Sequence, residues 1–189
     1  MRYAAKWPEY AKQWDRMRVK ASRRPELTEY AQYAIQHKEA YREIQQRTGV
    51  DWCHVAVIHR RESNGRFDRY LGNGESLKRK TLLVPKGRGP FSSFLDGAID
   101  ALHIDGLDDI KDWRLEKILY YCELFNGPGY ANRGIPSPYL WGGTNIQSKG
   151  KYVADGKWNP NAMDSQPGCA PILQLIAGID TSVTFVRES

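Results

Sequence analysis

Apolar residues recur along this chain at the three- and four-residue steps that place side chains on one face of a helix. The first such stripe predicts a helix over residues 7–21, and the next predicts a helix over 26–48 that ends at Gly49. A third stretch, 52–61, is apolar on nearly every side and follows Asp51, a residue type that caps helices. A helix of this composition is expected to be buried.

The pattern changes after this third helix. Residues 63–92 are rich in Gly, Asn, Ser, Lys and Pro, with short β-prone pieces, and predict a loop with a small hairpin or three-stranded sheet. Helical periodicity returns at 92–103, 112–125 and about 170–177. Residues 131–168 are polar and aromatic, with short helices at most, and the tail at 181–186 is either a strand or irregular.

These elements predict an α+β fold, mainly α, with a small sheet after the third helix. A length of 189 residues suits a single domain over 1–189, in which 1–49 form a helical lead-in and 50–170 the core that carries the site. Hydrophobic residues make up 41% and charged residues 26%, an ordinary globular balance that excludes a disordered or fibrous chain. Tyr and Trp are abundant, and their flat faces suit sugars and bases as well as cores.

Several simple classes are not expected. No apolar run approaches the roughly 18–20 residues of a membrane span, and the N-terminal sequence lacks the apolar core of a secretory signal. The three cysteines, Cys53, Cys122 and Cys169, lack metal-ligand spacing and cannot complete a disulfide framework. We expect buried thiols, no metal and no cofactor, in a fold completed in a reducing bacterial cytoplasm.

Charge is unevenly distributed along the chain, with a net value of +6. Residues 1–50 carry 11 basic and 6 acidic groups, residues 51–90 carry 9 and 4, and residues 91–130 carry 3 and 8. A basic N-terminal half predicts attraction to a polyanion. Nucleic acid and the bacterial cell wall, with its carboxylates and wall polymers, are the two candidates.

Glu62, at the end of the buried third helix, is the first candidate for chemistry. Burial and the negative end of the helix dipole both disfavour an ionised carboxylate and raise its pKa, as a general acid near neutral pH requires. The spacing leaves a second interpretation open, in which Glu62 pairs with Arg60, Arg61 or Arg66 at the surface.

Glu75 lies thirteen residues later, in a Gly-rich turn at the start of the expected sheet. A helix-end acid followed by a carboxylate on a small sheet is the layout that glycoside hydrolysis uses, with one group protonating the leaving oxygen and the other directing water or attacking the sugar. Taken alone, Glu75 also fits a solvated turn residue.

The stretch 52–63, with its Glu-Ser pair at a helix end, resembles the lysozyme superfamily, which includes goose-type lysozymes, lytic transglycosylases and helical chitinases. An ordered series of motifs is similar to bacterial and phage lysozyme-like peptidoglycan hydrolases. The series comprises 59–63 (HRRES), 70–75 (YLGNGE), 84–88 (VPKGR), 97–102 (GAIDAL), Tyr121, 130–134 (YANRG), 137–141 (SPYLW) and 150–156 (GKYVADG).

This resemblance implies a muramidase of endolysin type, with Glu62 as general acid acting on a β-1,4-linked amino-sugar polymer. It also implies that Glu75 is the general base of an inverting reaction, although the family more often has Asp in this turn; Asp155 is the alternative base. The segment 124–130 resembles the Tyr-Asn-Ala-Gly-Gly turn of lytic transglycosylases, which would present Asn126 and Tyr130 to a glycan. Further candidate glycan contacts are Tyr139, Trp141, Asn145, Gln147 and Tyr152.

Other functions remain open at this point. The same scaffold could cleave chitin or chitosan, or act as a lytic transglycosylase, and a non-enzymatic chain could bind the wall or nucleic acid. A basic chain is a poor match for cationic chitosan, and no nucleic-acid fold signature is present. We therefore expect a monomeric enzyme, made in the bacterial cytoplasm and of host or phage origin, that acts on cell-wall peptidoglycan and on no nucleic acid. His59 is expected to orient loops by hydrogen bonding.

Overall fold

A computed structural model of the chain describes residues 2–154 and 156–188. These residues form eight α-helices, two 3-10 helices and one antiparallel two-stranded sheet, which confirms the predicted mainly α, α+β class. They divide into two compact units, one made of residues 1–32 and 114–189 and the other of residues 33–113. Each unit is described by itself, and the predicted lead-in at 1–49 contributes to both.

The first unit begins with α1 (Tyr3–Arg16), which packs against α6 (Leu115–Asn126). The buried Tyr10 hydroxyl donates a hydrogen bond to the buried Glu123 carboxylate across this contact. α7 (Pro138–Trp141) packs against both α6 and α8 (Cys169–Ile179). The unit also contains η1 (Ala21–Arg23), most of α2 (Arg24–Gln36) and η2 (Ala131–Arg133).

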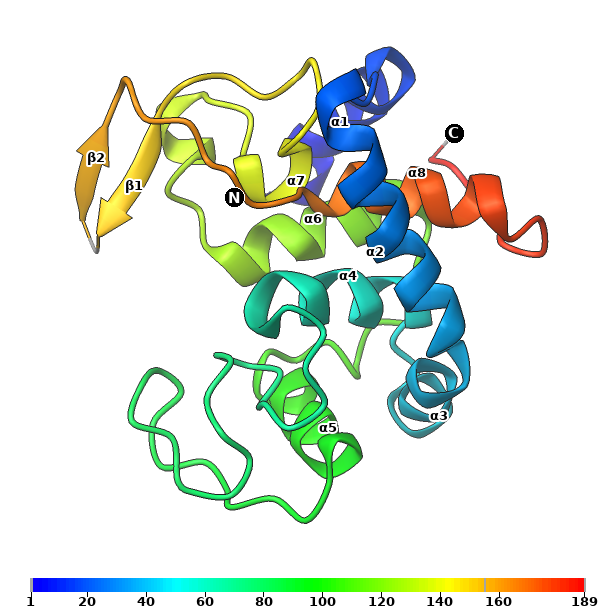
Figure 1. The fold of residues 1–189 in the computed structure, drawn as a ribbon, viewed down its shortest axis with the longest axis vertical. Helices are drawn as coiled ribbons and strands as arrows, with labels where there is room; N and C mark the ends of the chain where they lie inside the picture. The colour runs from blue at the N-terminus through cyan, green and yellow to red at the C-terminus, as the bar shows by residue number, and fades with distance from the viewer. Residues whose placement is uncertain (1, 155, 189) are drawn as a thin grey trace. The chain divides into compact units, whose positions relative to one another are not determined.

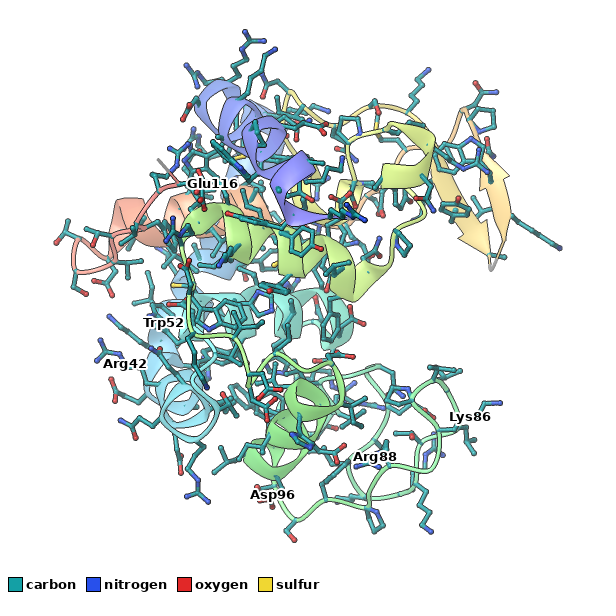
Figure 2. All side chains as sticks on the ribbon, turned by 180° about the vertical axis from the view of Figure 1, so that it is seen from behind. Arg42, Trp52, Lys86, Arg88, Asp96 and Glu116 are labelled. Atoms are coloured by element: carbon teal, nitrogen blue, oxygen red, sulfur yellow. The ribbon has the colours of Figure 1, made fainter. Side chains whose placement is uncertain are left out.

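The C-terminal tail of the first unit is attached to the start of α6. The Leu115 amide donates to the Val186 carbonyl at 2.8 Å. Glu116, labelled in Figure 2, is fully buried and accepts hydrogen bonds from the Arg187 guanidinium at 2.6 Å and from the Glu188 amide at 2.8 Å. The sequence allowed either a strand or irregular structure for the tail at 181–186. The tail is irregular, and these hydrogen bonds hold it against α6.

The second unit is built around α4 (Trp52–Ser63), with α3 (Lys38–Thr48) packed against α4 and α5 (Phe94–Ile104). Every residue of α4 from Trp52 to His59 is buried, as its sequence predicted. The Asp51 carboxylate caps the helix by accepting from the Cys53 amide at 2.9 Å and the His54 amide at 3.4 Å. This local order places the last turn of α4 at a defined point of the unit.

The predicted sheet lies elsewhere in the chain. The segment from residue 64 to residue 93, which joins α4 to α5 in Figure 1, forms only an isolated bridge between Arg69 and Ser76. Its backbone is held by turns and by side chains such as Thr81, whose hydroxyl donates to the Pro85 carbonyl at 2.5 Å. The sheet consists instead of β1 (Lys151–Ala154) and β2 (Lys157–Asn159) in the first unit.

Two helix boundaries also differ from the periodicity. The helix expected over 7–21 ends at Arg16, because Met17 is extended and Val19 forms a bridge with Thr144. The helix expected over 26–48 is two helices, which break at His37, where the ring Nδ1 lies 2.9 Å from the Tyr33 carbonyl oxygen. The predicted stop at Gly49 is confirmed, with a left-handed φ of 77°.

The three cysteines are buried thiols, as predicted, and no disulfide joins them. Within residues 2–154 and 156–188, no helix has the length and apolar character needed to cross a membrane.

Candidate functional site

Glu62 lies in the last turn of α4, with a half-buried side chain. The helix is followed by its capping residue Asn64, a non-glycine residue with a left-handed φ of 60°. The Asn64 amide donates to the Arg60 carbonyl at 3.0 Å, and the Gly65 amide donates to the His59 carbonyl at 3.2 Å. These bonds satisfy carbonyls that a helix end leaves without partners, and they turn the chain sharply just after Glu62.

An aromatic cluster fixes the chain after this turn. Phe67 packs with the rings of His37, Tyr41, His59 and Phe94, at centroid distances of 5.1, 5.9, 5.0 and 4.9 Å. The cluster therefore joins the loop to α3, α4 and α5. The Tyr41 hydroxyl lies 2.9 Å from Nδ1 of His59, within hydrogen-bond distance, and the His59 ring also packs against Phe67 of the loop.

The turn that carries Glu75 passes directly over the end of α4. Gly74 has a left-handed φ of 73°, and a Cβ atom there would collide with the backbone carbonyl oxygen of Glu62. The turn is closed by the Gly74 amide, which donates to the Tyr70 carbonyl at 2.8 Å, and by the Tyr70 amide, which donates to the Glu75 carbonyl at 2.7 Å. Only glycine allows this close approach, so the backbone of the turn that carries Glu75 lies directly against the backbone of Glu62.

The Glu75 side chain organises the loop beyond the turn. Its Oε2 accepts hydrogen bonds from the Leu82 and Leu83 amides, both at 2.8 Å, and from the Asn73 amide group at 3.3 Å. Its Oε1 has no hydrogen-bond partner in the described part of the chain. Glu75 is thus an anchor of the loop that keeps one carboxylate oxygen available, rather than a merely solvated turn residue.

A second anchor ties the loop to α5. Asp100 accepts a hydrogen bond from the Tyr70 hydroxyl at 2.8 Å, and its two carboxylate oxygens accept from Nε and Nη2 of Arg88, a residue that Figure 2 labels. Burial raises the pKa of Asp100, but the hydrogen bonds from Arg88 and Tyr70 outweigh it and hold the pKa below its ordinary value. Asp100 is therefore an anion that holds both ends of the segment 70–88.

Arg66 is engaged with a different partner from the one considered in the sequence. Its guanidinium forms two hydrogen bonds with the exposed Asp68 carboxylate, at 3.0 and 2.8 Å. The Arg60 guanidinium donates to the Asn64 carbonyl at 2.7 Å. Both arginines therefore support the turn after α4.

In the first unit, the predicted residues Tyr130 and Tyr152 belong to an aromatic–arginine cluster that also contains Trp158 and Arg133. The Tyr152 ring lies 5.4 Å from that of Tyr130 and 5.0 Å from that of Trp158, its cross-strand partner. The Arg133 guanidinium lies 4.5 Å above the Trp158 ring, and its Nε donates to the Tyr152 hydroxyl at 2.8 Å. A Cβ at Gly150 would collide with the Trp158 ring.

Most of the other predicted glycan contacts are buried or hydrogen-bonded within the fold. Tyr139 and Trp141 are buried in α7, so they present no open ring face on which a sugar could stack. The buried Gln147 amide accepts from the Gly143 amide at 2.9 Å and donates to the Asp164 carbonyl at 2.7 Å. Asn145 binds the Arg18 amide at 2.7 Å and the Arg16 carbonyl at 3.1 Å. Asn126 is exposed at the end of α6, and Asp155 lies outside the described residues.

Comparison with protein-family models, with curated proteins and with solved structures finds no match to this chain. Among residues 2–154 and 156–188, no group of three or more His, Cys, Asp or Glu side chains is arranged to hold a metal ion.

Two members of the aromatic–arginine cluster, Arg133 and Trp158, were not predicted. The Asp-Gly pair at 155–156, flanked by β-prone residues, is a strong hairpin signal, and it would have placed Trp158 opposite Val153. A shift in register between Tyr152 and Ala154, which the turn signal does not predict, places Trp158 opposite Tyr152 instead. Arg133 follows Tyr130 by three positions, and no local pattern marks it as a ring-stacking residue.

Proposed function

We propose that this chain is a glycoside hydrolase that cleaves the β-1,4 glycan backbone of bacterial peptidoglycan, as a muramidase of endolysin type does. Glu62 is the general acid that protonates the leaving oxygen, and Glu75 is the general base that activates water. The observation that carries the proposal is the contact of the Gly74 turn with the Glu62 carbonyl, which brings the two acidic segments together. The ordered motifs that resemble lysozyme-like hydrolases support the same assignment.

The surroundings of the two carboxyl groups fit distinct roles. Glu62 is half-buried at the end of a buried helix, where a carboxyl group is partly removed from water. Glu75 is held in place through Oε2, and its Oε1 is the oxygen that would take a proton from water. An acid and a base on separate, rigidly held segments are what an inverting mechanism needs.

Mass spectrometry of peptidoglycan digested by the full-length chain tests the reaction. We expect reducing muramic-acid ends without anhydro-sugars, since water is the acceptor in hydrolysis. Reducing glucosamine ends would show a glucosaminidase. Anhydro-sugars would show a lytic transglycosylase, and Glu75 would then not be a water-activating base. Cleavage of chitin but not of peptidoglycan would show that the chain is a chitinase.

The variant Glu62→Gln tests the acid. The amide is nearly isosteric with the carboxyl group and cannot donate the proton, so wall lysis should fall to at most a few per cent of wild type, on the order of the 10²–10⁴-fold that acid–base groups contribute. Its thermal unfolding should match wild type. A variant that retains more activity than this would exclude Glu62 as the acid.

The variant Glu75→Gln separates the base from the loop anchor. Glutamine keeps an oxygen that can accept from the Leu82 and Leu83 amides, but it cannot take up a proton from water. Turnover should fall by orders of magnitude, while binding to insoluble peptidoglycan stays close to wild type. Unchanged turnover in a folded Glu75→Gln variant would pass the base role to another carboxylate, with Asp155 the first to replace.

A further inference from the structure

The loop segment 78–88 carries a short, exposed apolar tip that the proposed catalytic reaction does not use. Leu82, Leu83 and Val84 have exposed fractions of 69%, 60% and 78%. Among the described residues, the other large exposed apolar side chains are single and separated in sequence. Scattered apolar side chains are normal at a surface, but three consecutive aliphatic residues at a loop tip indicate a contact surface.

Cations flank this tip on both sides. Lys78, Arg79 and Lys80 precede it, Lys86 follows it, and no carboxylate pairs with these four exposed side chains in the part of the chain that the structure describes. Figure 2 shows Lys86 at the outer edge of the loop, whereas Arg88, at the base, is paired with Asp100. The segment 78–88 contains no acidic residue.

Most backbone polar groups of the tip already have hydrogen-bond partners within the chain, which suits a medium of low polarity. The Leu82 and Leu83 amides donate to Glu75, and the Leu83 and Val84 carbonyls accept from the Asn73 side chain at 3.3 and 3.4 Å. Pro85 has no amide hydrogen, and its carbonyl accepts from Thr81. The hydrocarbon region of a bilayer offers no water to backbone N–H and C=O groups, so a loop tip whose groups are already paired pays a smaller desolvation cost on entering it.

We propose that this loop binds the surface of anionic lipid bilayers, with Leu82, Leu83 and Val84 inserted among the acyl chains. The four flanking cations then lie at the level of the negatively charged headgroups. An apolar anchor combined with a polybasic patch is the pairing of signals that gives stable peripheral binding. Nucleic acid is a poorer match, because the tip has no aromatic ring on which a base could stack. The proposal does not depend on glycan cleavage.

Sedimentation of the full-length chain with lipid vesicles tests the proposal. Vesicles of mixed phosphatidylglycerol and phosphatidylcholine should bind the chain at least about tenfold more tightly than vesicles of phosphatidylcholine alone. The variant Leu83→Asp should weaken binding to the anionic vesicles by about tenfold or more. Val186→Asp is the matched control, because Val186 is 70% exposed and lies far from this loop in sequence, and it should bind as wild type does.

A fluorescence measurement reports insertion directly. The native cysteines are buried, so an environment-sensitive thiol probe labels Leu83→Cys selectively, with Val186→Cys as the control. Addition of anionic vesicles should shift the emission of the probe at position 83 to the blue and leave the probe at position 186 unchanged.

Three results would overturn the proposal. The first is equal binding of wild type and Leu83→Asp to anionic vesicles. The second is sedimentation of labelled Leu83→Cys with the vesicles without a blue shift. The third is a loss of binding by Leu83→Asp to purified peptidoglycan but not to vesicles, which would assign the loop to the cell wall instead. Because the vesicles contain no glycan, the two vesicle outcomes do not depend on whether the chain is a hydrolase.

Discussion

The buried imidazole of His59 supports the end of α4 from behind. It lies 4.2 Å from the Phe94 ring and 5.0 Å from the Phe67 ring, measured between centroids. Burial lowers the pKa of His59 to about 4, from an ordinary value of 6.5, because the charged imidazolium would lose its hydration there. His59 is therefore neutral at neutral pH and acts as a packing residue with a hydrogen bond to Tyr41.

This low pKa predicts a loss of stability in acid. Between pH 6.5 and 4 the unfolded state binds the proton at this position and the folded state does not, so the free energy of unfolding falls as the pH falls through this range. The contribution of His59 to that loss is about 3 kcal/mol. Urea unfolding of wild type and His59→Gln at pH 7 and pH 4 measures it, and the variant should lose correspondingly less stability.

His103 provides a control of opposite sign. It is exposed, and its pKa is raised by the hydrogen bond to Asp108, at 2.7 Å, and by the charge of that carboxylate. Its contribution to stability is present at low pH and is lost as the pH rises above its unfolded value. His103→Gln should therefore leave the acid-induced loss in place; an equal reduction in both variants would show that His59 is not its source.

At the scale of elements, the loop between α4 and α5 is organised by contacts between residues distant in sequence rather than by a sheet. Phe67 enters the aromatic cluster, Glu75 binds the backbone of the tip, and Asp100 holds Arg88. The Gly74 turn is the point at which this loop meets the Glu62 backbone of α4, the helix that carries the proposed general acid. Removing that contact should separate the two acidic segments while leaving α4 intact.

Gly74→Ala tests the importance of this contact, with Gly87→Ala as a matched control in the same loop. Both glycines have a left-handed φ, 73° and 77°, so both variants lose about 1 kcal/mol to backbone strain. A Cβ at position 87 meets open space, whereas one at position 74 collides with the Glu62 carbonyl. Gly74→Ala should therefore cost about 1–3 kcal/mol more in the free energy of unfolding, and it should also reduce wall lysis much more strongly.

Urea unfolding measures the first effect and a turbidity assay of wall lysis the second. Equal effects of the two substitutions on both measurements would show that the contact between the Gly74 turn and α4 has no role in holding the site.

On the scale of the whole molecule, the charge pattern is the feature most relevant to a partner. Residues 60–88 carry 9 basic and 3 acidic groups, and residues 96–112 carry 1 basic and 6 acidic groups. The second unit therefore has little net charge but a strong separation of charge along its chain. A basic segment that includes both proposed catalytic residues would attract an anionic wall to the site.

Wall lysis should consequently weaken as ionic strength rises. The Debye length falls from about 10 Å at 0.1 M salt to about 3 Å at 1 M, so the attraction loses its reach. We expect a severalfold decrease in the lysis rate between about 0.05 and 0.5 M salt. The triple variant Lys78→Gln/Lys80→Gln/Lys86→Gln should show a flatter salt dependence. A wild-type lysis rate that does not change with salt over this range would show that long-range electrostatic attraction has no role in wall binding.

The sequence by itself determined the elements whose causes are local. The periodicity of apolar residues, the capping carboxylate of Asp51 and the left-handed stop at Gly49 located most helices to within a few residues, and the composition of 52–61 showed that this helix is buried. These features depend on neighbours within about one helical turn, so a linear pattern carries them. Glu62 was placed at the end of α4 for the same reason.

Only the tertiary structure decided where the loop and the aromatic residues lie. Two contacts join residues whose separation in sequence does not relate them: the approach of Gly74 to the Glu62 carbonyl and the hydrogen bonds from the Leu82 and Leu83 amides to Glu75. The burial of Trp141 likewise depends on the helices that pack around α7. The sheet is formed by β1 and β2 rather than by the segment after α4, where the backbone is hydrogen-bonded within turns and to side chains and forms no continuous ladder. Such contacts depend on which surfaces meet after folding, and a local pattern does not encode them.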